Sequence, residues 1–185
     1  MNDFLIALRF AALSVALLGL ALPLAMAQLN TLMFPHQARG SLIERGGQVV
    51  GSTLVGQSFT GERYFHGRPS AAGYDPRAAA GSNLAPSNPA LRERAQADSA
   101  RIAAANNVAP WDIPVDLIAA SGGGLDPHIS PAAAALQVPR IARARSLPED
   151  RIAALVAAHT AGPTLGIFGQ PRVNVLELNL ALDAE

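Results

Sequence analysis

Ser121-Gly122-Gly123-Gly124-Leu125-Asp126-Pro127-His128-Ile129-Ser130 is the stretch around which the rest of the chain is organised. Its three consecutive glycines carry no side chain, so the backbone can adopt positive φ or let another group come close. Pro127 biases Asp126 towards an extended conformation, and Ser130-Pro131 is typical of a helix start with Ser130 as the N-cap. A glycine loop that enters a helix N-terminus can hold an anion, because free N–H groups and the helix dipole converge there. The pattern also fits a tight turn that only caps a helix, which is the commoner role of a glycine-rich turn, and both interpretations stay open.

The composition excludes several classes of function. All 14 basic residues are arginine and are balanced by 14 acidic ones, so the formal net charge is zero and no nucleic acid partner is expected. Without lysine the chain can form neither a P-loop nor a Schiff base. Without cysteine it has no disulfide, thiolate metal site or cysteine nucleophile. The histidines lack the spacing of zinc ligands; they are His36, His66, His128 and His159.

The N-terminal region is the next strong signal. Residues 10–34 contain no charge and are mostly apolar, and about 20 such residues suffice to span a bilayer. We therefore expect a short cytoplasmic N-terminus (1–9), a transmembrane helix (10–34) and one periplasmic domain (35–185). A competing interpretation is a signal peptide cleaved after Ala25-Met26-Ala27. Either way the large C-terminal part is exported, because large domains translocate largely regardless of their charge.

Short strands are expected in three places. Residues 46–59 are β-branched, apolar and punctuated by glycine, which predicts two short strands or a hairpin with its bend near Gly51. Residues 166–169 and 172–175 have the same character and are interpreted as two further strands.

Four helices are expected as well. One covers about 89–106 with Asn88 as its N-cap. One follows Ser130, and Pro139 must kink or restart it. A third covers 149–158, with acids in its first turn, and a fourth closes the domain at 176–183. Helices and strands are thus segregated rather than alternating, which favours an α+β fold.

Several residues outside the glycine stretch are also candidates for the core or for a site. Tyr64-Phe65 is expected in the core. Arg68 is either a solvated loop residue or a fork for a carboxylate or phosphate. Residues 73–89 form a long loop, which tends to be functional or disordered. Asp112 and Asp116 are expected to pair with arginines, to line a site, or to serve as caps or surface charges.

Taken together, several motifs resemble one family. They are Gly51-Ser52 with the run to Phe59, Tyr64-Phe65 with Arg68-Pro69-Ser70, Ser82-Asn83-Leu84 with Asn88-Pro89, the stretch 121–130, Gln137 with Arg140, and Val173-Asn174-Val175-Leu176-Glu177-Leu178-Asn179. This combination, spread over the whole chain, resembles the C subunit of the Kdp potassium-transporting P-type ATPase. The family loop usually reads Ser-Gly-Ser-Gly before Leu-Asp-Pro-His, and here Gly123 replaces the middle serine. If that hydroxyl bonds a ligand in relatives, it is missing here.

The resemblance implies an accessory subunit that is not itself an enzyme. The pump's catalytic subunit is phosphorylated in an Asp-Lys-Thr-Gly motif, which a chain without lysine cannot contain. The implied role is to stabilise a potassium uptake complex and to raise the ATP affinity of the catalytic subunit. The implied partners are a potassium-channel-like subunit, the catalytic ATPase subunit, a small membrane subunit and the lipid of the inner membrane.

The resemblance also implies ATP as a ligand, although no firmly bound cofactor is expected. The implied nucleotide contacts are Ser121, Gly122, Gly124, Asp126, His128 and Gln137. The predicted topology argues against this role, because it places the loop outside the cytoplasm, where ATP is scarce.

Two alternatives to a pump subunit arise from the residues alone. One is an exported protein, secreted or anchored, that binds a small anion at the loop before Ser130. The other is a hydrolase using Ser121, His128 and Asp126, which is disfavoured because no Gly-x-Ser-x-Gly pattern surrounds Ser121.

Overall fold

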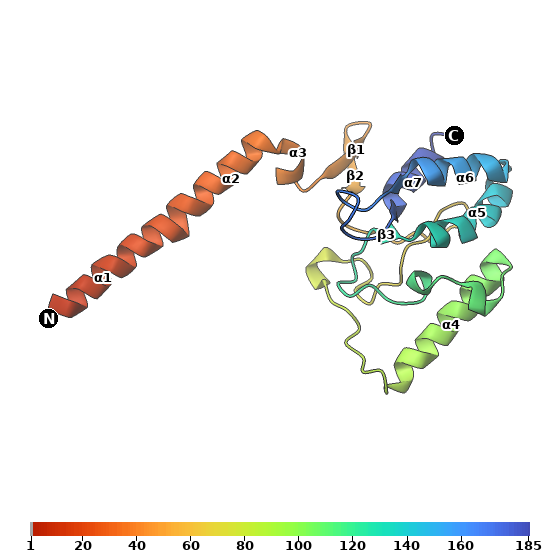
Figure 1. Ribbon diagram of the computed structural model, residues 1–185, viewed down its shortest axis with the longest axis horizontal. Coiled ribbons are helices and arrows are strands. Elements are labelled where there is room, and N and C mark those ends of the chain that lie inside the picture. Colours follow the sequence, from red (N-terminus) through yellow and green to blue (C-terminus); the bar gives the residue numbers. More distant parts are fainter. Residues whose placement is uncertain (1) are drawn as a thin grey trace. The chain divides into compact units, whose positions relative to one another are not determined.

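The computed structural model describes residues 2–185 and divides into two compact units, Met1–Val50 and Gly51–Glu185. The first unit begins with one continuous helix over Asn2–Met33, visible at the N-terminus in Figure 1. Its parts are α1 (Asn2–Ser14), the π-helical segment η1 (Val15–Ala21) and α2 (Leu22–Met33). No residue within these three segments is buried, and the helix is long and apolar enough to cross a membrane. The helix extends further towards the N-terminus than the predicted span 10–34, whose limits remain a prediction.

The π-helical turns lie directly before Pro23. Proline has no N–H, so it leaves a carbonyl one turn earlier without its usual partner. The helix widens there: the Leu22 N–H donates to the Leu17 carbonyl, five residues back. A local proline effect of this kind is a recognised cause of irregular turns in long helices.

A short helix and a hairpin follow. These are α3 (Pro35–Ala38), β1 (Leu42–Arg45) and β2 (Gln48–Ser52). A hairpin is present, but it spans residues 42–52 instead of the predicted 46–59. Its bend lies at Gly46 and Gly47, so the expectation of a bend near Gly51 is wrong. Gly46 and Gly47 both have positive φ (+60° and +78°), the conformation that a two-residue hairpin turn requires.

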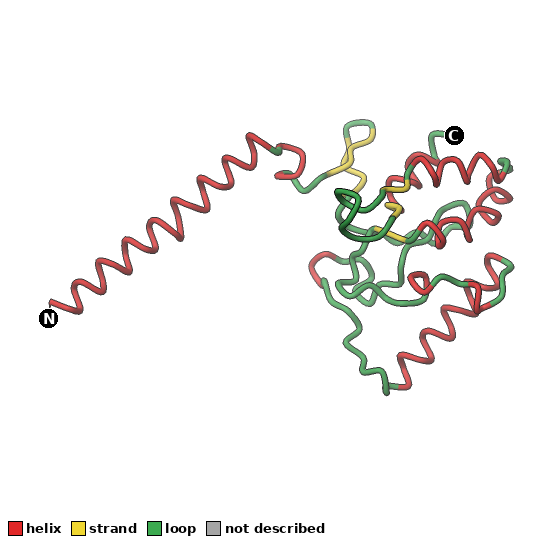
Figure 2. The backbone as a smooth tube through the Cα atoms, in the orientation of Figure 1, coloured by secondary structure: helices red, strands yellow, loops and turns green. Residues whose placement is uncertain are grey.

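The second unit contains a small antiparallel sheet with strand order β3-β5-β4. The strands are β3 (His128–Ile129), β4 (Thr160–Ala161) and β5 (Arg172–Asn174). Val173 of β5 lies opposite Ile129 on one side and Thr160 on the other. The strands are short and the rest of the unit is helical or irregular (Figure 2), so the predicted α+β class is confirmed.

The helices of this unit are α4 (Pro89–Asn106), α5 (Pro131–Arg145), α6 (Glu149–Ala158) and α7 (Val175–Leu182), with single 3₁₀ turns η2 (Pro76–Ala78), η3 (Pro110–Asp112) and η4 (Val115–Leu117). The last three α-helices pack in sequence, α5 on α6 and α6 on α7. Ile141, Ile152, Leu178 and Leu182 form the centre of the core and are fully buried. Phe65 joins this core, as predicted, whereas Tyr64 is only partly buried and lies outside the core.

The helix starts are confirmed at their caps. The Asn88 side chain accepts from the Ala90 N–H at 3.0 Å, and the Ser130 hydroxyl accepts from the Ala133 N–H at 3.0 Å. The helix does not restart at Pro139, because α5 runs from Pro131 to Arg145 without interruption, and the alternative, a kink at Pro139, stays a prediction. Proline removes the hydrogen bond to the carbonyl four residues earlier, and that residue, Ala135, is exposed to solvent.

The strand predicted at residues 166–169 is also wrong, because this segment is a turn. Thr164 and Phe168 form a single bridge, with N–H to carbonyl distances of 2.8 and 2.9 Å. Between and after them, Leu165, Gly166 and Gly169 have positive φ (+55°, +74° and +84°), which ends any extended conformation.

Candidate functional site

The glycine stretch is held to the domain by hydrogen bonds at its first residue. The Ser121 N–H donates to the Pro69 carbonyl at 3.0 Å, and the Ser121 carbonyl accepts from the Gly124 N–H at 3.2 Å. The Ser121 hydroxyl accepts from the Asp126 N–H at 3.3 Å, and the residue is buried. The Ser121 side chain therefore closes the loop on itself instead of pointing to solvent.

Among the three glycines, Gly124 is the one whose backbone requires glycine. Its φ is +71°, and an added Cβ would lie 2.8 Å from both the Ala72 Cβ and the Ala80 carbonyl oxygen. The Ser70 hydroxyl also donates to the Gly124 carbonyl at 2.6 Å. A Cβ on Gly122 or Gly123 would meet nothing within 4 Å, so a serine would fit where Gly123 stands.

Asp126 is the electrostatic centre of the loop. Its carboxylate accepts from Arg68 Nη1 at 2.9 Å and from the His128 N–H at 3.0 Å, and His128 Nδ1 lies 3.5 Å away. The His128 side chain and N–H, with Arg68, outweigh partial burial and hold the pKa of Asp126 at about 2. Arg68 thus binds a carboxylate of its own chain with one Nη group, while its Nη2 donates to the Ala119 carbonyl at 3.3 Å.

The N-terminus of α5 already faces a carboxylate. Asp116 accepts from the Ser130 N–H at 2.7 Å and from the Ser130 hydroxyl at 3.1 Å. The pairing of Asp116 with an arginine considered above is not seen, since its oxygens lie on the helix cap. An exogenous anion at this helix start would have to compete with that negative charge.

An open groove of about 480 Å³ runs past these groups. Its lining residues come from the loop, η4, β3 and the segment before β5: Arg68, Val115, Asp116, Asp126, His128, Ile129, Ser130, Gln170, Pro171 and Arg172. Two arginines stand against two aspartates, so the groove has no excess of positive charge. Among residues 2–185, no group of three or more His, Asp or Glu side chains is placed to hold a metal ion.

Gln137 lies in a different environment from the loop. It is 2% exposed and lines a small cavity of about 20 Å³ with His66 and Leu117, among others. Its amide is fully engaged: Oε1 accepts from the His66 N–H and Arg140 Nη2, both at 2.8 Å, and Nε2 donates to the carbonyls of His66 and Ala133, both at 3.1 Å. The structure thus brings Asp126 and His128 together at the groove, whereas the amide of Gln137 bonds only to groups inside the domain. The nucleotide contacts implied for these three residues remain a prediction.

Sequence reasoning missed the most elaborate polar arrangement of the domain. Every carbonyl of residues 62–66 accepts a hydrogen bond from a helix side chain, and we call this arrangement the carbonyl clamp. The donors are Arg140 to Glu62 and Tyr64, Arg145 to Arg63, Asn179 to Phe65, and Gln137 to His66. A weak signal existed in the sequence, because Arg140 and Asn179 interrupt apolar helix faces. A buried polar side chain in such a place needs a partner.

Comparison with known proteins adds the family to this geometry. The family model described as "K+-transporting ATPase, c chain" matches residues 4–184. The chain belongs to the KdpC family. Three KdpC subunits of potassium-transporting ATPases illustrate the similarity. That of Methylobacterium nodulans is 56% identical over 181 residues, covering 90% of this chain and 89% of the relative. That of Methylorubrum extorquens is 55% identical with the same coverage. That of Shewanella putrefaciens is 59% identical over 156 residues, covering 84% and 78%.

Family membership confirms the resemblance inferred from the sequence motifs. As a KdpC protein, the chain is a non-catalytic subunit of the Kdp potassium-transporting ATPase. Its N-terminal apolar helix is consistent with a single-pass membrane anchor.

Proposed function

We propose that the chain is anchored by its N-terminal helix, carries its folded domain outside the cytoplasm, and stabilises the pump by contacts there. The observation that carries this proposal is the apolar helix Asn2–Met33, none of whose segments buries a residue. Apolar side chains over such a length need lipid or another membrane helix around them. The proposed partners are the potassium-channel-like, catalytic and small membrane subunits.

The proposed orientation follows from the size of the domain. The domain that follows the apolar helix is large, and large domains translocate largely regardless of charge. The proposed site of action is the outer face of the pump, near the point where potassium enters.

We propose that any effect on the pump's ATP affinity is indirect. Direct contact through the implied nucleotide residues meets three obstacles: Gln137 is buried, Asp126 is paired with Arg68, and the proposed topology separates the loop from cytoplasmic ATP. A second carboxylate argues against the small-anion-binding alternative, because Asp116 occupies the start of α5.

Protease treatment of intact spheroplasts tests the proposal. The domain should be digested from outside, while a cytoplasmic control protein stays intact. Protection of the domain until the cells are lysed would reverse the topology and restore direct ATP contact as the better proposal.

The mass of the mature chain separates an anchor from a signal peptide. A retained N-terminus keeps the helix, whereas a mature chain that begins at Gln28 would rule out the anchor. Titration of ATP into the purified full chain completes the test, and saturable binding at submillimolar concentration would contradict an indirect effect.

A further inference from the structure

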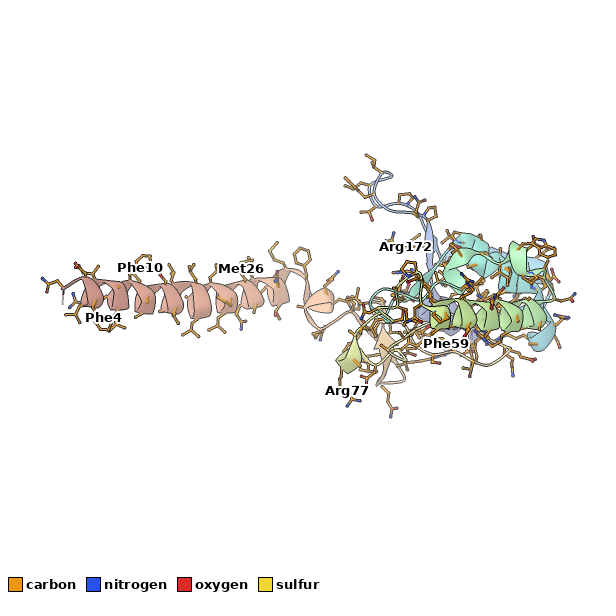
Figure 3. All side chains as sticks on the ribbon, turned by 90° about the horizontal axis from the view of Figure 1, so that it is seen from below. Phe4, Phe10, Met26, Phe59, Arg77 and Arg172 are labelled. Carbon is orange, nitrogen blue, oxygen red and sulfur yellow. The ribbon has the colours of Figure 1, made fainter. Side chains whose placement is uncertain are left out.

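Three exposed apolar side chains sit together on the turn between β4 and β5. Leu165, Ile167 and Phe168 are 83%, 78% and 63% exposed, and we call them the apolar tip. Figure 3 shows the loop that precedes Arg172 projecting away from the helices of the domain. Single exposed apolar residues are ordinary on a protein surface, but three within four positions on one projecting turn call for an explanation.

The apolar tip rests on an ordered turn. Besides the Thr164–Phe168 bridge, the Gly166 N–H donates to the Pro163 carbonyl at 3.0 Å and the Ile167 N–H donates to the Thr164 carbonyl at 3.2 Å. These bonds fix the backbone, so the three side chains are displayed in a defined arrangement. A preorganised apolar surface loses little conformational entropy on binding.

Leu165 occupies this turn against its conformational preference. Its φ of +55° lies in the left-handed region, which glycine tolerates and asparagine adopts by local hydrogen bonding. Leucine has neither advantage, and at 83% exposure its side chain gains almost no burial within the domain. The stability of the domain therefore does not account for a leucine here, and such an outlier indicates a function outside the fold.

The chemistry of the turn favours a protein partner over lipid. No charged residue occurs from position 160 to position 171. Segments that lie on bilayer surfaces usually combine apolar residues with basic ones that meet anionic headgroups. An uncharged apolar tip complements an uncharged apolar recess, and as a subunit of the Kdp potassium-transporting ATPase the chain has other protein subunits as neighbours.

We propose that the apolar tip inserts into an uncharged apolar recess on the exported side of another subunit of the pump. The inference rests on the proposed exported position of the domain. It adds the residues that make the contact and the chemistry of the surface that receives them.

Photo-crosslinking in the assembled complex tests this contact. The full chain carries a benzophenone amino acid in place of Phe168 and is produced together with the other pump subunits. Irradiation should yield an adduct between this chain and one other subunit, identified by mass spectrometry. The same probe in place of Trp111, which is 85% exposed away from the turn, is the control and should give little of that adduct. Adducts with lipid alone, or no adduct at position 168, would overturn the proposal.

Two substitutions provide a second measurement. Phe168→Ser and Leu165→Asn should each weaken association by about tenfold or more, the effect of losing one buried large apolar side chain. The melting temperature of the full chain should not fall, and for Leu165→Asn it should be equal or higher, since asparagine suits the left-handed region. Trp111→Ser is the matched control and should leave assembly unchanged.

Unchanged recovery of the complex with both tip variants would contradict the proposal. A failure of the proposed function has a different signature: the wild-type chain would not co-purify with the pump, or its domain would be protected in spheroplasts.

Discussion

The side-chain amide of Gln137 pairs with the backbone of His66 in both directions: Oε1 accepts from the His66 N–H at 2.8 Å and Nε2 donates to the His66 carbonyl at 3.1 Å. Asn179 pairs with the backbone of Phe65 in the same way: Oδ1 accepts from the Phe65 N–H at 2.8 Å and Nδ2 donates to the Phe65 carbonyl at 3.0 Å. Two amides from two helices, α5 and α7, thus replace the neighbouring strand that this stretch of backbone lacks.

Gln137→Ala should destabilise the domain. It leaves the N–H and carbonyl of the partly buried His66 without these partners and takes one acceptor from Arg140, which together should cost about 2–4 kcal/mol. Urea unfolding of the full chain in detergent measures the loss. Arg143→Ala, on an exposed position of the same helix, should stay within about 0.5 kcal/mol. A Gln137→Ala protein of wild-type stability that binds ATP less well would instead support the nucleotide contact.

Asn179→Asp should give a protein whose stability depends on pH in an unusual direction. An ionised aspartate can accept from the Phe65 N–H but cannot donate to the Phe65 carbonyl, so only its protonated form fits the site. Its folded pKa is therefore raised above the unfolded value of about 3.9. The stabilising form is present below that value and is lost as pH rises through the folded pKa. Melting temperatures should lie well below wild type at pH 7 and approach wild type near pH 4. A constant deficit across this range would contradict the prediction.

Gly124→Ala and Gly123→Ser should differ sharply. The first forces a Cβ to within 2.8 Å of the Ala80 carbonyl oxygen at φ +71°, with an expected cost of about 1–3 kcal/mol. The second places its side chain in open space and should change stability by less than about 0.5 kcal/mol. Thermal unfolding of the two variants side by side makes the comparison. Equal stabilities would show that the turn can relax around the added methyl group.

Asp126 should contribute an acid-sensitive part of the stability. Its folded pKa of about 2 lies below the ordinary 3.8, so its contribution is complete above pH 3.8 and is lost as pH falls towards 2. After allowance for solvent screening this amounts to about 1 kcal/mol. In Asp126→Asn this component should be missing, and its stability should fall less steeply than that of wild type between pH 4 and pH 2. Parallel curves would assign the acid response to other carboxylates.

Local signals in the sequence predicted the elements better than the contacts between them. Asn88-Pro89 and Ser130-Pro131 located two helix starts, because a cap acts on N–H groups two or three residues away. The bend of the hairpin and the turn at Leu165 were missed, because apolar β-branched composition does not reveal which residues take positive φ.

Only those contacts of the candidate site that are local in the sequence could be predicted. Asp126 and His128 lie two positions apart and were visible as a motif, whereas Arg68 and Asp126 lie 58 positions apart. The sequence indicated Gln137 as a candidate site residue. It did not reveal that Gln137 pairs with His66, which lies 71 positions earlier in the chain, before α4. Partners at such distances are set by the packing of the whole domain, not by any window of sequence.

The carbonyl clamp has a consequence for how the chain is made. Its hydrogen bonds join residues 62–66 to groups 71 to 114 positions later in the sequence, so ribosomes release this segment long before its partners exist. A backbone without partners cannot be buried at acceptable cost. Phe65, whose N–H and carbonyl both bond to Asn179, therefore cannot take its buried place in the core until α7 has been synthesised. The clamp thus makes the burial of an early segment depend on a helix that is made much later.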